Sequence, residues 1–199
     1  LLNNQFNFSQ GHKLGLVSFQ YSKVKGGVEF LLDSPYKNYF RKMKKHIKFD
    51  NGDIIYHDTG EGYPLVLLHG YLETSLVWKE FAEALSAYFR IIAIDLPGHG
   101  GSSVYGAEHS MEFMAEAVRS VVDAENIDRF MLAGHSMGGY VALAFVEKYP
   151  HRLYAYCLFH SHPFPDTEEL IANRRREIKV VESGKKDIIY PVNIPRMFA

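Results

Sequence analysis

The sequence predicts an α/β protein with a mostly parallel sheet and helices on both of its faces. From residue 44 to residue 159, short apolar runs typical of buried strands alternate with apolar stripes at helical spacing. Regular strand–helix alternation favours a parallel sheet built by crossover connections. We expect about six strands, followed by the beginning of a helical cap.

The first strands are predicted at residues 46–49 and 53–57, around the turn Asp50-Asn51-Gly52. The Asn-Gly pair in this turn suits positive φ angles. Residues 65–68, Leu-Val-Leu-Leu, form a continuous apolar run that is typical of a strand buried on both faces.

The following elements alternate between helix and strand. Helical stripes are expected at Trp78, Phe81, Ala82, Leu85 and Phe89, and again at Met111, Met114, Ala115, Val118, Val121 and Val122, with Ser110 as the N-cap of the second helix. Further strands are predicted at 90–96, 130–133 and 153–159, with an apolar helix at 140–146. Residues 166–183 are strongly charged and predict a helix outside the sheet.

The predicted domain organisation has three parts: an irregular extension at 1–43, a core at 44–163 and the start of a cap at 164–199. Residues 1–42 show no sustained period, and Met43 directly precedes the first recognisable strand. We therefore expect 1–42 to be upstream or added sequence. A small accessory element is the alternative.

The composition excludes several classes of protein. The 199 residues are 47% hydrophobic and 14% aromatic, which argues against a disordered chain. A single Cys, Cys157, rules out a disulfide framework and favours a reducing compartment. No apolar run approaches the roughly 18–20 residues of a spanning helix, and the first ten residues lack the features of a signal peptide. We expect a cytoplasmic protein with no membrane contact.

The charge is unevenly distributed along the chain. Residues 1–48 carry a net charge of +7 and the remainder −8, which gives −1 overall. A basic segment at 37–48 raises the alternative of a nucleic-acid-binding protein. A solvated charge run is the simpler interpretation, so no nucleic-acid partner is expected.

The most informative motif is Gly134-His135-Ser136-Met137-Gly138-Gly139. It contains Gly-x-Ser-x-Gly directly after a predicted strand and directly before a predicted helix, the context that a nucleophile elbow requires. Ser136 is the candidate nucleophile on a strained turn, and side chains at Gly134 and Gly138 would collide with neighbouring backbone.

Acyl transfer through a serine also requires two N–H donors for the developing oxyanion. We expect one from Met137, which follows the nucleophile, and one from Tyr71, in the loop His69-Gly70-Tyr71 after an earlier strand. Tyr71 packing only against the pocket wall is the alternative. His69 is expected to be structural.

Two other segments predict little chemistry. The Gly-rich loop at 95–102 lacks a nucleotide-binding pattern, so no cofactor is implied. His160 and His162 form an H-x-H pair without a third ligand, and no metal site is expected.

The three motifs HGY (69–71), DLPGHGGS (95–102) and GHSMGG (134–139), in this order and spacing, resemble the α/β-hydrolase superfamily. They are most similar to its cap-bearing esterases, lipases and peroxidase-like members. The resemblance covers about residues 44–199. It implies that Asp95 and His99 shape the pocket entrance without doing chemistry and that the cap begins after Phe159.

The sequence departs from the family pattern at its end. The family supplies the acid and histidine of its catalytic triad after later strands, so these residues are expected beyond residue 199, and the chain as given is expected to be nearly inactive. A rearranged triad is the alternative, with Asp166 as the acid and His99, His160 or His162 as the base.

The functional prediction is a serine hydrolase that acts on a small-molecule ester or related acyl substrate through an acyl-enzyme on Ser136. A non-catalytic ligand-binding protein with the same fold is the alternative. The sequence predicts no particular oligomeric state.

Overall fold

The computed structural model describes residues 43–185, 188 and 189. The predicted N-terminal extension, and the part of the basic segment before Met43, lie outside the described residues. No helix in the described part combines the length and apolar character needed to cross a bilayer.

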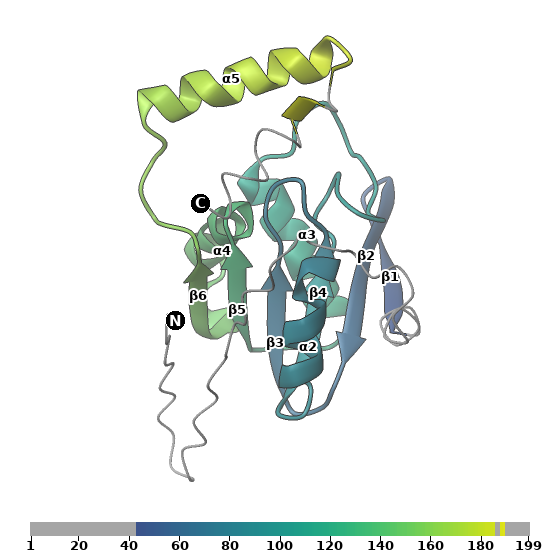
Figure 1. Cartoon of the computed structure of the whole chain (residues 1–199). Coiled ribbons are helices and arrows are strands. Elements are labelled where there is room, and N and C mark those ends of the chain that lie inside the picture. Colours follow the sequence, from purple (N-terminus) through teal and green to yellow (C-terminus); the bar gives the residue numbers. More distant parts are fainter. Residues whose placement is uncertain (1–42, 186–187, 190–199) are drawn as a thin grey trace, which may run out of the picture. The chain divides into compact units, whose positions relative to one another are not determined.

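A six-stranded sheet forms the centre of the fold, in the order β1-β2-β4-β3-β5-β6 (Figure 1). Its strands are β1 Lys44–Phe49, β2 Gly52–Thr59, β3 Tyr63–Leu68, β4 Phe89–Ile94, β5 Phe130–His135 and β6 Leu153–Phe159. The pairs β1–β2 and β2–β4 are antiparallel, whereas β4–β3, β3–β5 and β5–β6 are parallel. The predicted mostly parallel α/β sheet is therefore confirmed.

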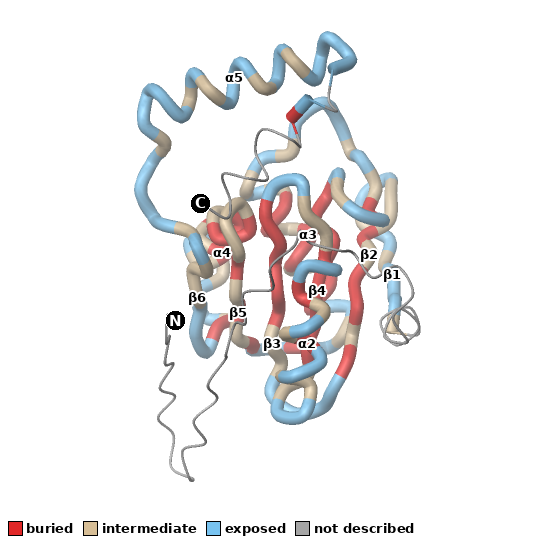
Figure 2. The backbone as a smooth tube through the Cα atoms, in the orientation of Figure 1, coloured by how far each residue is buried: buried red, intermediate tan, exposed pale blue. Residues whose placement is uncertain are grey.

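Helices cover both faces of this sheet. The helices of the described part are η1 Ser75–Trp78, α2 Lys79–Leu85, α3 Met111–Ala124, α4 Met137–Lys148, η2 Pro150–Arg152 and α5 Glu168–Glu182, of which α5 lies outside the sheet layer. Because successive strand residues point to opposite faces, Val66 and Leu68 join the larger buried cluster with α3 and α4, while Leu67 packs with Trp78 and Ala82 on the α2 face. Figure 2 shows the resulting run of buried residues along the central strands.

The first predicted helix is shorter than its apolar stripe indicated. The helix ends at Leu85, where Ser86 N–H donates to the Ala82 carbonyl and Tyr88 N–H to that of Leu85. Phe89 instead begins β4, in register with Tyr63, and packs against the same cluster as α2. The helix α2 and the start of β4 bury apolar residues in the same cluster, so their apolar positions continued a single helical spacing in the sequence.

The hairpin between β1 and β2 also differs in detail. Phe49 pairs with Gly52, so the loop consists of Asp50 and Asn51, and the positive φ, 47°, belongs to Asp50. Gly52 is needed for space: a Cβ there would lie 2.5 Å from Cβ of Ser103.

The charged helix predicted at 166–183 is α5. The Thr167 hydroxyl caps it by accepting from Leu170 N–H at 3.3 Å, and none of its residues is buried. A helix outside the sheet layer was expected from this composition. The assignment of 164–199 as a cap remains a prediction.

The topology places a switch point at the carboxyl ends of β3 and β5. These strands are parallel neighbours, but the chain leaves β3 towards α2 on one face and leaves β5 towards α4 on the other. The two connections diverge, and the carboxyl edge at such a switch point is where open α/β sheets bind ligands.

Candidate active site

Ser136 occupies the sharp turn between β5 and α4. Its φ of 48° and ψ of −114° lie in a region that L-residues rarely adopt. Three hydrogen bonds hold its backbone: Ser136 N–H donates to the Phe159 carbonyl at 3.0 Å, and the Ser136 carbonyl accepts from Gly139 N–H and Ser161 Oγ, both at 2.9 Å. The strained geometry expected of an elbow is therefore present.

The two motif glycines relieve different collisions. A Cβ at Gly134 would overlap the carbonyl group of Gly138, inside the turn itself. A Cβ at Gly138 would lie 2.5 Å from the Leu68 carbonyl oxygen and 2.6 Å from that of His69, at the end of β3. The predicted steric requirement is met at both positions. Gly139 is restricted as well, by Ser161, which sequence reasoning missed.

The loop after β3 packs directly against the elbow. A Cβ on Gly70 would lie only 3.2 Å from Cβ of Ser136, so the main chain before Tyr71 passes beside the candidate nucleophile. Tyr71 is 37% exposed, and Met137 begins α4 on the other side of Ser136. The structure thus brings Tyr71, Ser136 and Met137 to one edge of the sheet. The roles of Tyr71 and Met137 as oxyanion donors remain predictions.

His69 links this loop to the end of β4. Leu96 N–H donates to Nε2 at 3.0 Å, which leaves the proton on Nδ1 to be donated to the Gly70 carbonyl at 2.8 Å. The side chain is fully buried, and burial lowers the pKa of His69 to about 4. A neutral imidazole with both nitrogens engaged by backbone fits the expected structural role.

Asp95 is likewise committed to backbone contacts. One carboxylate oxygen accepts from Ser75 N–H and the other from Gly101 N–H, each at 2.8 Å. Asp95 is buried. Nδ1 of His99 is 3.1 Å from the Pro97 carbonyl oxygen, and the ring centroid of His99 is 5.1 Å from that of His69. The Asp95 carboxylate thus joins the loop at 95–102 to the start of η1, and the shaping of a pocket entrance by Asp95 and His99 remains a prediction.

The structure does not assemble the rearranged triad. Asp166 pairs with Arg174 through both carboxylate oxygens, at 2.6 and 3.1 Å. Nδ1 of His162 accepts from Phe164 N–H at 3.3 Å. Within residues 43–185, no hydrogen bond joins Asp166 to His99, His160 or His162. His160 has a positive φ of 46° and its ring lies 6.1 Å from that of His135.

Sequence reasoning missed Glu73, which meets His135 beside the elbow. Oε2 of Glu73 accepts from Gly70 N–H at 2.6 Å and from His135 Nδ1 at 2.9 Å. Burial by itself would raise the pKa of the Glu73 carboxyl, but the hydrogen bonds from His135 and Gly70 outweigh it and lower that pKa. No spacing rule in the sequence marks Glu73, because His135 lies 62 residues further along the chain, at the end of β5.

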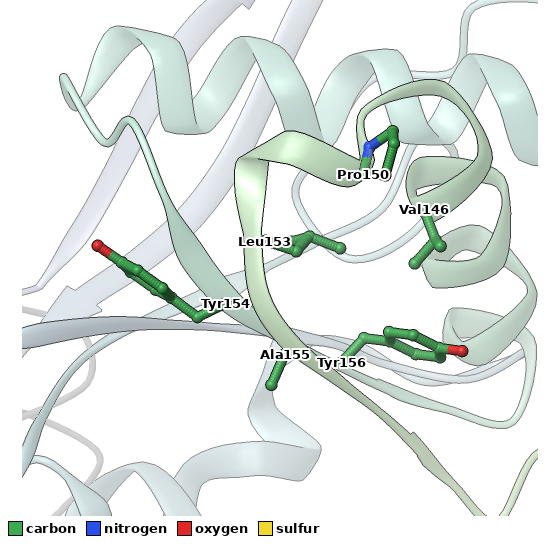
Figure 3. Close-up of a pocket in the computed structure, with 6 residues that line it drawn as sticks. All are labelled: Val146, Pro150, Leu153, Tyr154, Ala155 and Tyr156. Carbon is green, nitrogen blue, oxygen red and sulfur yellow. The ribbon is translucent and has the colours of Figure 1, made fainter. Parts of the chain in front are cut away.

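A hollow of about 430 Å³ lies elsewhere, at the amino-terminal half of β6 (Figure 3). It is lined by Val146, Pro150, Leu153, Tyr154, Ala155 and Tyr156. Ser136 contacts the opposite end of β6, at Phe159. The hollow is therefore not part of the candidate active site. Among the described residues, no group of three metal-ligating side chains is placed to hold an ion.

Comparisons with known proteins agree with this architecture. A family model described as alpha/beta hydrolase fold matches residues 63–179. A serine hydrolase-like protein of Danio rerio is 36% identical over 121 residues, which are 59% of this chain and 37% of the relative. A pimeloyl-[acyl-carrier protein] methyl ester esterase of Aeromonas hydrophila is 35% identical over 105 residues, 52% of this chain and 40% of the relative.

The solved structures give the same result. A thermophilic esterase from Thermogutta terrifontis superposes with a TM-score of 0.72 at 34% identity, covering 77% of this chain and 58% of that one. The chain spans about two fifths of the length of the two curated relatives and over half of this esterase. Its sheet order, its elbow and the match of the family model over more than half of its residues lead to one conclusion: the chain belongs to the alpha/beta hydrolase fold family.

Proposed function

We propose that this chain carries the nucleophilic part of a serine hydrolase that acts on an ester or related acyl substrate. The observation that carries the proposal is the backbone of Ser136, held at φ 48° and ψ −114° by three hydrogen bonds between a parallel strand and a helix N-terminus. Strained non-glycine residues of this kind cluster at functional sites, which supports a chemical role for Ser136.

In the proposed reaction, Ser136 Oγ attacks the acyl carbon while its proton passes to a general base. The resulting oxyanion accepts hydrogen bonds from the backbone N–H groups of Met137 and Tyr71, and the α4 dipole favours the same negative charge. Collapse of the intermediate expels the alcohol, which takes the proton. Water then releases the acid from the acyl-enzyme and restores Ser136. No cofactor enters this scheme.

Neither His69 nor Asp166 takes the part of triad base or acid in this proposal. His69 is buried with both nitrogens bound to backbone, and Asp166 is paired with Arg174. The names of two similar proteins, both esterases, support the choice of an ester as the substrate class.

Ester hydrolysis by the protein with its natural chain ends tests this proposal. We expect turnover of a short-chain p-nitrophenyl ester with a burst of p-nitrophenol, and a loss on the order of 10⁴–10⁶-fold in Ser136→Ala. Ser86→Ala is the matched control, because Ser86 Oγ only bonds the Glu83 carbonyl at the far end of α2. Undiminished turnover in Ser136→Ala would place the nucleophile elsewhere. Ester binding without turnover in the unaltered protein would favour the non-catalytic alternative.

A further inference from the structure

We propose that Glu73 is a positioning residue that sets the distance between the oxyanion-binding loop and Ser136. This inference rests on the proposed function, since it concerns the placement of the Tyr71 amide relative to the nucleophile. Glu73 itself does not touch the substrate. It acts through Gly70 and His135, which directly precede Tyr71 and Ser136.

The arrangement depends on one carboxylate oxygen. Oε2 of Glu73 accepts from Gly70 N–H at 2.6 Å and from His135 Nδ1 at 2.9 Å. Gly70 directly precedes Tyr71, and His135 directly precedes Ser136. A single acceptor therefore ties together the ends of β3 and β5, one residue before each proposed functional group.

The Gly70 carbonyl, on the far side of this residue, accepts from His69 Nδ1 at 2.8 Å, so Glu73 and His69 hold the two sides of Gly70. Residues 70–73 form a tight turn. Glu73 N–H donates a long hydrogen bond, 3.4 Å, to the Gly70 carbonyl, and Leu72 has a positive φ of 60°. A Cβ on Gly70 would lie 2.9 Å from Glu73 Oε2 and 3.1 Å from His135 Nδ1. The glycine thus lets the loop backbone sit directly on the Glu73–His135 pair.

Packing fixes the histidine half of the arrangement. The His135 ring lies edge-on to Trp78 at 6.4 Å and tilted against Phe159 at 6.0 Å. The Glu73 and His135 side chains are 17% and 19% exposed. Because both side chains are largely enclosed, the oxygen that accepts the two hydrogen bonds is held at a fixed place beside the loop.

Small displacements matter at this site. An oxyanion donor must lie about 2.7–3.1 Å from the developing charge, and a misplacement of 1 Å can reduce turnover about 10²-fold. Releasing Gly70 from Glu73 frees the peptide that precedes the Tyr71 amide. The expected defect is in kcat, because the donor acts mainly on the transition state.

Three variants of Glu73 separate position from charge. Glu73→Ala and Glu73→Asp, which lack the carboxylate or shorten its reach, should each lower kcat about 10- to 100-fold with KM changed less than about threefold. Glu73→Gln should stay within about threefold of the unaltered protein, because its amide oxygen can still accept both hydrogen bonds. Glu80→Ala, an exposed acid on α2, is the matched control.

A second measurement reads the same arrangement without turnover. Amide hydrogen exchange at Gly70 should accelerate at least about tenfold in Glu73→Ala and Glu73→Asp but not in Glu73→Gln. If Glu73→Ala fails to fold, the comparison of Asp with Gln carries the test alone. Wild-type kcat in Glu73→Asp, or equal losses in Gln and Asp, would overturn the proposal.

Including Ser136→Ala separates this inference from the proposed function. If Ser136→Ala abolishes turnover while Glu73→Asp leaves kcat unchanged, Ser136 is the nucleophile and the positioning role is wrong. If Ser136→Ala keeps turnover, the proposed function fails, and unchanged Gly70 exchange in Glu73→Asp would then overturn the positioning role as well.

Discussion

At the scale of single residues, the site combines a strained serine with glycines on either side where no Cβ fits. A positive φ at a residue with a Cβ costs on the order of 1–3 kcal/mol. The hydrogen bonds from Gly139 N–H and Ser161 Oγ to the Ser136 carbonyl, and from Ser136 N–H to Phe159, offset this cost. Two segments of the chain, residues 159–161 and the first turn of α4, thus hold the strained residue.

The buried His69 should make the free energy of unfolding depend on pH. Its folded pKa of about 4 lies below the ordinary value of 6.5 because the side chain is buried. As the pH falls through 6.5, the unfolded chain binds a proton that the folded chain does not, so this residue destabilises the fold progressively down to about pH 4. Linkage predicts a loss of roughly 2 kcal/mol between pH 7 and pH 5.

Urea unfolding at pH 7 and pH 5 measures this loss. His69→Gln removes the titrating group, so its free energy of unfolding should change less between the two pH values, whatever its starting stability. His151→Gln, which replaces an exposed histidine in η2, is the control and should keep the pH dependence of the unaltered protein. Identical pH dependence in His69→Gln and the unaltered protein would contradict the assignment.

At the scale of elements, the elbow depends on how closely α4 approaches β3. The amino end of α4 lies against the last carbonyls of β3, with Gly138 at the contact. The same approach brings the helix N-terminus to the carboxyl ends of β3 and β5. The close approach of α4 to β3 therefore also sets the position of Ser136 relative to the loop after β3.

Gly138→Ala tests the contact between these elements. The added Cβ would lie 2.5 Å from the Leu68 carbonyl oxygen, and the overlap is with backbone, which cannot rotate away. We expect a loss of stability of about 1–3 kcal/mol, a melting temperature lower by several degrees, and reduced ester turnover.

Gly106→Ala is the matched control for this variant, because its Cβ would have no neighbour closer than 3.8 Å. It should melt within about one degree of the unaltered protein by circular dichroism. A Gly138→Ala variant that melts and turns over like the control would refute the steric account of the elbow.

At the scale of the whole molecule, the features that could be predicted from the sequence are those that residues close together in the chain determine. Strand–helix alternation and the GHSMGG motif were sufficient for the mostly parallel sheet and the position of Ser136, because both depend on near neighbours in the chain. The helical prediction at Phe89 was wrong because Phe89, at the start of β4, packs in the same cluster as the apolar residues of α2 and fits their spacing. Glu73 and Ser161 were missed because the contacts that matter, with His135 and with Ser136, join residues far apart in the sequence, and one sequence carries no signal for such contacts.

The central claim is that Ser136 is the nucleophile, and covalent labelling tests it most directly. The protein with its natural chain ends would be treated with a fluorophosphonate, digested and mapped by mass spectrometry, beside Ser136→Ala and Ser86→Ala. The account predicts a single phosphonyl adduct on Ser136, lost in Ser136→Ala and kept in Ser86→Ala. An adduct that persists at the same rate in Ser136→Ala, or that maps to another serine, would contradict it.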